Sequence, residues 1–85
     1  MRTILASAAV LAAFVGTALA ADRPVTDDER AKLVSAITAA GCSGGKMEWD
    51  QSDREFEVDD ATCDGRRYDL KFNPDYSLKS KKQDT

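Results

Sequence analysis

The most reactive side chains in this 85-residue sequence are those of two cysteines, Cys42 and Cys63. The sequence has no histidine, which excludes a histidine-based triad or acid–base pair. The cysteines form no Cys-x-x-Cys motif and have no third sulfur near them, which argues against a redox pair or a metal site. Ser43 precedes Gly44 and Gly45 without a base, and this segment lacks the Lys-Ser/Thr ending of a phosphate-binding loop. We therefore expect no catalytic residue and no cofactor.

The first twenty residues predict an export signal. Arg2 precedes an apolar run over 4–15, and the small-residue pattern 18–20 follows it. This run is shorter than the about 20 apolar residues of a membrane helix, so we expect a signal peptide at 1–20 that is cleaved, with no stable membrane anchor afterwards. The domain would then span 21–85, in the periplasm or secreted. Loss of Arg2 leaves 11 basic and 15 acidic side chains, a net charge of −4, which makes nucleic acid an unsuitable partner.

Residues 27–40 are predicted to form one amphipathic helix. Thr26 and Glu29 fit a capping box, and the acidic first turn suits the positive end of the helix dipole. Apolar residues recur at helical spacing from Leu33 onward, and Gly41 supplies the left-handed residue that ends many helices. The apolar side of this helix requires a surface to cover.

From Lys46 onward, apolar and polar residues alternate, which predicts four short strands in an antiparallel meander. A two-residue turn at 52–53 places Trp49 opposite Phe56, and the apolar side chains of both strands then share one face. The same parity test, in which the apolar residues of two paired strands must share one face, favours a three-residue loop at 63–65 over a two-residue Asp-Gly turn. The predicted fold is α+β, with one N-terminal helix packed on a four-stranded antiparallel sheet.

The C-terminal residues are expected to complete the sheet. A fourth strand is predicted to follow the turn at 73–75 and to include Tyr76 and Leu78. We interpret the lysine-rich segment 79–85 as a solvent-exposed, frayed end. The ordered core of the domain is therefore expected to span about 26–79.

The predicted register also explains the cysteines. Continued outward from the first hairpin, it places Cys42 level with Cys63 beside the end of the helix. An exported chain meets an oxidising compartment, so we expect these residues to form a disulfide. A closed loop of about 22 residues would contribute ~3 kcal/mol by the chain-entropy relation.

Together these elements resemble the PepSY domain, a family named from peptidase propeptides and a spore-germination protein. The resemblance rests on the capped helix ending at Ala40-Gly41, the strand with Trp49, Phe56-Glu57-Val58, the Asp64-Gly65 turn and Arg67-Tyr68-Asp69-Leu70-Lys71-Phe72. It implies a helix packed on an antiparallel sheet, in a non-catalytic and often exported module associated with the restraint of proteases. The turn at 73–76 lacks the glycine common in the family, and the cysteine pair is not a general family feature.

One charged surface is a candidate for partner binding. The register sets Glu48 opposite Glu57 and Asp50 opposite Glu55, on the face away from the helix. The strand from Lys46 to Asp50 is also predicted to be a sheet edge, whose unpaired backbone groups can accept an extended peptide. The candidate partner-binding residues are therefore Lys46, Glu48, Asp50, Glu55 and Glu57.

The predicted function is that of an exported, non-enzymatic binding or regulatory module that restrains a protease or binds another envelope protein. Two alternatives remain, a small cation-binding protein that uses the acidic face and a purely structural envelope protein. Asp59, Asp60 and Asp64 do not follow the spacing of a 12-residue calcium loop, and we interpret them as residues of solvent-exposed turns.

Overall fold

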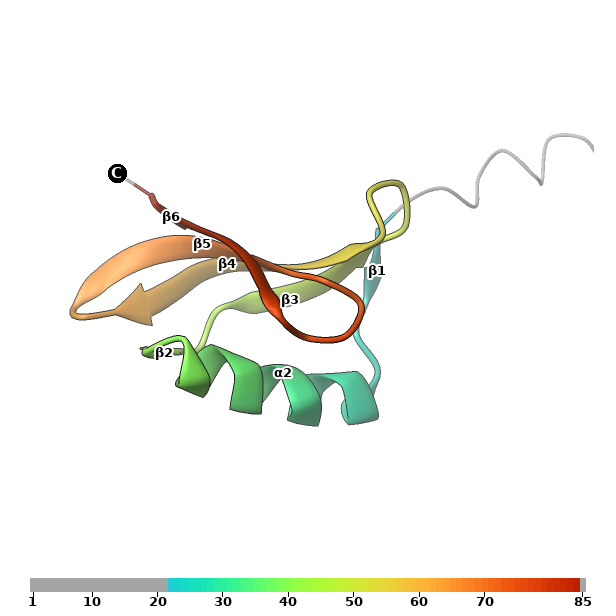
Figure 1. The fold of residues 1–85 in the computed structure, drawn as a ribbon, viewed down its shortest axis with the longest axis horizontal. Coiled ribbons are helices and arrows are strands. Elements are labelled where there is room, and N and C mark those ends of the chain that lie inside the picture. Colours follow the sequence, from blue (N-terminus) through green and yellow to red (C-terminus); the bar gives the residue numbers. More distant parts are fainter. Residues whose placement is uncertain (1–21, 85) are drawn as a thin grey trace, which may run out of the picture.

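A computed structural model describes residues 22–84, and the expected export signal at 1–20 lies outside the described residues. The described residues form one α-helix against a six-stranded antiparallel sheet (Figure 1). The elements are β1 (Arg23–Pro24), α2 (Asp27–Ala39), β2 (Cys42–Ser43), β3 (Lys46–Asp50), β4 (Glu55–Cys63), β5 (Arg66–Phe72) and β6 (Leu78–Gln83). The strand order is β1-β3-β4-β5-β6, with β2 also paired to β4. The α+β class is confirmed, whereas the predicted count of four strands is wrong.

Helix α2 begins at the capping box that the sequence predicts. The Glu29 amide donates to Thr26 Oγ1 at 3.1 Å, and the Thr26 amide donates to Glu29 Oε1 at 2.9 Å. Leu33 and Ile37 are the buried residues of the helix. Gly41 follows the last turn with a φ of 83°, the left-handed geometry for which glycine is favoured.

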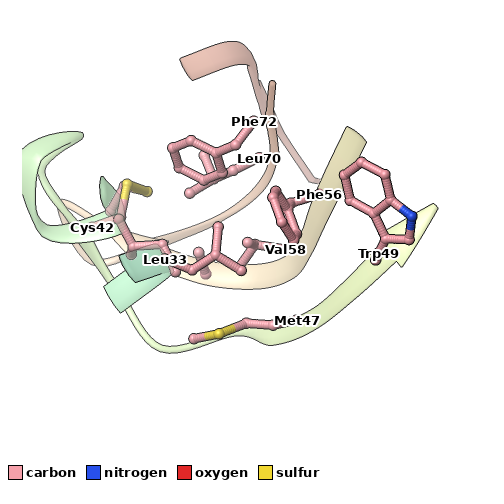
Figure 2. Close-up of a cluster of buried hydrophobic side chains, with 11 residues drawn as sticks. Leu33, Cys42, Met47, Trp49, Phe56, Val58, Leu70 and Phe72 are labelled. Carbon is pink, nitrogen blue, oxygen red and sulfur yellow. A yellow bond between two sulfur atoms is a disulfide. The ribbon is translucent and has the colours of Figure 1, made fainter. Parts of the chain in front are cut away.

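The hydrophobic core lies between α2 and one face of the sheet, as Figure 2 shows. Its buried members are Leu33, Ile37, Cys42, Met47, Trp49, Phe56, Val58, Ala61, Cys63, Leu70 and Phe72. A single helix covers only one face of the sheet, which explains why the strands alternate between apolar and charged residues. The other face carries the acidic residues that the sequence singles out.

The first hairpin has the predicted register. Trp49 pairs with Phe56 in β3 and β4, and β2 continues the same register with Cys42 opposite Cys63. The two cysteines form a disulfide with their Cα atoms 4.2 Å apart. The predicted disulfide is therefore confirmed, and it ties the C-terminal end of α2 to β4.

The second hairpin differs from the prediction in its turn. Val58 pairs with Leu70 as predicted, but the turn contains only the two residues 64–65. The register shifts instead within β4, between Val58 and Ala61, where Asp60 adopts a φ of 59°. A β-bulge in the strand thus holds the extra residue that the parity test assigned to the loop. Both turn residues have positive φ, as a two-residue hairpin turn requires.

Strands at both ends of the chain extend beyond the predicted core of 26–79. Residues 80–83 of β6 pair with β5, so the prediction that this segment frays is wrong, although most of its side chains are exposed as predicted. Strand β1 pairs with β3 through Arg23 opposite Trp49 and Pro24 opposite Glu48. Within the described part of the chain, no helix has the length and apolar character needed to cross a bilayer.

Candidate functional site

The outer edge of β3, where the sequence predicts partner binding, is partly covered by the chain itself. Strand β1 lies along this edge just before α2 begins (Figure 1). In the described residues it pairs with Glu48 and Trp49, two of the five residues of β3. The Lys46 end of the edge lies beyond the reach of β1, because the chain there turns into the helix. The prediction that β3 is an edge strand is therefore wrong for Glu48 and Trp49, which pair with β1, while β1 leaves the Lys46 end of β3 uncovered.

Arg23 is the residue that anchors β1. Its guanidinium donates two hydrogen bonds to the Glu29 carboxylate, at 2.9 and 3.0 Å, and lies 5.8 Å from the centroid of the Trp49 ring. The paired geometry suits a guanidinium better than an ammonium group. Hydrogen bonding from Arg23 lowers the pKa of Glu29 to about 2, against an opposing contribution from burial and with further help from the Thr26 amide.

On the opposite face of the sheet, three carboxylates converge at the same edge. Oxygens of Asp22, Glu48 and Glu57 lie within 4.8 Å of one another. Burial raises the pKa of Glu57 to about 7, and the negative charges of Asp50 and Asp22 add to this effect. Burial, followed by the charges of Asp50 and Glu48, likewise raises the pKa of Asp22. This surface therefore favours an incoming positive charge, although Lys71 opposite Glu57 offsets part of the excess.

Two of the predicted partner-binding residues have structural roles. Glu55 is 2% exposed, and its carboxylate lies 2.6 Å from Lys79 Nζ and 3.4 Å from Lys71 Nζ. Asp50 Oδ1 accepts hydrogen bonds from the amides at 52 and 53, at 3.0 and 3.2 Å, and thereby holds the β3–β4 turn. These bonds, first that from residue 53, lower the pKa of Asp50.

The other predicted residues remain at the surface of the edge. Glu48 and Glu57 are directly opposite each other, as the register predicts, and both are partly exposed. Lys46 is exposed, with its Nζ 3.8 Å from a Glu48 oxygen. The structure therefore brings Glu48 and Glu57 together as the accessible charges, while their role in binding stays a prediction.

The sequence matches the family model described as peptidase propeptide and YPEB domain over residues 2–80. The chain belongs to the PepSY family. No curated protein and no solved structure is significantly similar to it. The family match agrees with the helix on an antiparallel sheet, and it is consistent with a regulatory or propeptide-like module.

The turn before the last strand of this PepSY domain contains a bulky residue with a positive φ. Tyr76 adopts a φ of 71°, an unusual conformation for a bulky side chain. Its ring stacks on Phe56 with centroids 5.0 Å apart, and the Lys32 ammonium lies 5.8 Å from its centroid. The aromatic contact therefore compensates for the backbone conformation at this turn.

Two structural features at the candidate site of this PepSY domain could not be predicted from the sequence, namely strand β1 and the contact of Glu29 with Arg23. A two-residue strand is too short to show a period, so no pattern could reveal Arg23 and Pro24 as part of the sheet. Glu29 was assigned to the helix cap, and its contact with Arg23 depends on where β3 places β1. The one available signal was a basic residue six positions before an acidic capping residue.

Proposed function

We propose that this PepSY domain is an exported, non-enzymatic regulatory module that binds an extended, basic segment of a protease or another envelope protein along the outer edge of β3. The observation that carries the proposal is strand β1, because this edge already holds a short extended segment by backbone pairing and by an arginine side chain. Sheet edges are a recurrent site for peptide recognition by strand addition. The disulfide fits an oxidising compartment and supports export.

The charges near the edge define the chemistry of the segment. Asp22, Glu48 and Glu57 make one side of the edge acidic, and Glu29 supplies a carboxylate on the other side. A basic segment would therefore gain favourable contacts on both faces. These contacts are partly exposed, and screening acts within about 8–10 Å at physiological salt. The complex is accordingly weak to moderate in affinity and sensitive to salt.

The test is made at pH 8, above the pKa of Glu57, and compares two double variants that each remove two negative charges. E48Q/E57Q alters the proposed surface, and D60N/D64N alters the bulge and turn at the other end of β4, where asparagine tolerates positive φ. Both are compared with wild type for capture of partner proteins from envelope extract, at low and at high salt. We expect E48Q/E57Q to abolish the low-salt capture that wild type and D60N/D64N share. Equal capture by all three proteins would contradict the proposal. Asp50 is left unchanged because it holds the turn.

Cation binding is the second candidate function, and the convergence of the Asp22, Glu48 and Glu57 oxygens favours it. Calorimetric titration with calcium chloride distinguishes the two. A saturable heat that E48Q/E57Q loses and D60N/D64N retains would support a cation-binding role. A titration without saturable heat would contradict the cation-binding role.

A further inference from the structure

The geometry points to β1 as a resident strand that the partner must displace, and to a partner segment with an arginine between two other basic residues. This inference rests on the proposed function, since it specifies how the β3 edge becomes accessible and what it recognises. Three observations support it: the pairing of β1 with β3, the site where Arg23 contacts Glu29 and Trp49 (the seat of Arg23), and the charges that surround Asp22 and Pro24.

Strand β1 is held on the edge by few contacts. It pairs with only two residues of β3. Its main side-chain contact is the pair of hydrogen bonds from Arg23 to Glu29. The Arg23 side chain is 45% exposed, so water competes for this ion pair. A short edge strand held mainly by one partly exposed side chain is open to replacement.

The residue before the anchor opposes the attachment of β1. Asp22 lies within 4.8 Å of the oxygens of Glu48 and Glu57, and both neighbours carry the same charge as Asp22 when ionised. Like charges across a sheet destabilise the pairing. Arg23 therefore holds the segment on one face while Asp22 weakens it on the other. A competing strand with a neutral or basic residue in the place of Asp22 would avoid this repulsion.

The alternation of a strand specifies three positions of the competitor. Arg23 contacts Glu29 and Trp49 on the helix side, so the residues before and after it point to the opposite face. That face holds Glu48 and Glu57. The preferred sequence is thus basic–Arg–basic, with the central guanidinium in the seat of Arg23. Glu29 is ready to receive it, since the Thr26 amide already holds one of its oxygens.

A displacing strand could also form a longer ladder than β1 does. The chain leaves the edge after Pro24 because it must enter α2, which starts at Asp27. A separate segment has no such constraint and could continue opposite Met47 and Lys46. Added backbone pairing and the removal of the Asp22 repulsion both favour the competitor over β1.

The probe for this inference is a fluorescein-labelled peptide with acetylated and amidated ends and the central sequence Lys-Arg-Lys. Its affinity is measured by fluorescence anisotropy for the wild-type chain, for R23A, and for R66A as a control that removes one positive charge at the β4–β5 turn. In wild type, β1 reduces the fraction of open edges and hence the apparent affinity. We expect R23A to bind the peptide about five-fold more tightly, the factor that ~1 kcal/mol of lost ion pairing yields, and R66A to bind like wild type.

Two further measurements identify the seat. E29Q keeps the capping box, because glutamine can replace glutamate there, and in the R23A background it should lower the peptide affinity about five-fold. A Lys-Glu-Lys peptide should bind R23A more weakly than Lys-Arg-Lys by a similar factor. Amide exchange at Trp49, which is paired with Arg23, should be faster in R23A than in wild type, and slow again when the peptide is added.

The outcomes separate this inference from the proposed function. Equal peptide affinity for wild type and R23A, with weaker binding to E48Q/E57Q, would overturn the displacement of β1 and leave the proposed function intact. Equal binding of Lys-Arg-Lys and Lys-Glu-Lys to R23A would overturn the arginine seat. A peptide that binds none of these proteins would contradict both the inference and the strand addition on which it rests.

Discussion

Replacement of Glu57 by glutamine should make the stability of the domain less dependent on pH. Glu57 is a partly exposed residue of β4 that faces Glu48, Asp50 and Asp22 across the sheet, with Lys71 on the other side. Its pKa is raised from 4.5 to about 7, first by burial and then by the charges of Asp50 and Asp22. An acid whose pKa is higher in the folded than in the unfolded protein adds stability below pH 4.5. That stability is lost as the pH rises through about 7.

The magnitude follows from this difference in pKa. At about 1.4 kcal/mol for each pKa unit, the difference between about 7 and 4.5 sets a ceiling of ~3 kcal/mol. Glu57 is partly exposed, and solvent screening reduces such contributions. We therefore expect wild type to lose about 1–2 kcal/mol relative to E57Q between pH 4.5 and pH 8.

The assay is urea unfolding of wild type and E57Q at pH 4.5 and pH 8, followed by the fluorescence of Trp49. This is the single tryptophan of the sequence and it is 8% exposed in the fold. Urea is preferred to guanidinium chloride because it leaves the charges unscreened. D64N is the control, since it removes a carboxylate from an exposed turn and should change stability by no more than ~0.5 kcal/mol. A free-energy difference between wild type and E57Q that is equal at both pH values would refute the reasoning.

Three other predictions concern the chain's covalent state and its glycines. C42S/C63S should unfold at ~2–4 kcal/mol lower free energy than wild type, and denatured wild type should take up a thiol label only after reduction; labelling without reductant would contradict the disulfide. G45A should destabilise the fold by about 1–3 kcal/mol in urea, because residue 45 has a φ of 101° and an added Cβ would lie 2.6 Å from Val58 Cγ1; an unchanged midpoint would be the contrary result. Intact mass of the exported protein should give an N-terminus at Ala21, and retention of 1–20 would show that the export signal is not cleaved.

The elements with a clear local signal were predictable from the sequence. The capping box gave the start of the helix, and parity set the pairing of Trp49 with Phe56. The disulfide followed from extending that register to Cys42 and Cys63. Each of these inferences depends on residues close together in the sequence or related by a fixed period.

The features that could not be predicted depend on tertiary contacts or on a point where the strand's alternation between the two faces reverses. Val58 and Ala61 both face the core although they are three residues apart, and this spacing was the available signal for a bulge in the strand. The sequence predicts Glu55 as a surface acid, because its alternation with Phe56 indicates which face of the sheet it occupies and not how deeply it is buried. Its burial results from Lys71 and Lys79, which reach it from β5 and β6. The position of Lys79 depends on the pairing of β6, which lies mostly in a segment that the sequence suggests would fray.

The bulge in β4 has a counterpart across the sheet. Cys42 and Met47 both face the core although they are five positions apart, a spacing that regular alternation would place on opposite faces. The alternation therefore reverses at 44–45, across the sheet from its reversal at 59–60 in β4. Lengths in these two segments are therefore coupled. Deletion of one residue from either segment alone would turn one cysteine away from the other, whereas one deletion in each would restore the pairing and leave both strands regular. In evolutionary terms, insertions and deletions at these two sites should occur together in chains that keep the disulfide.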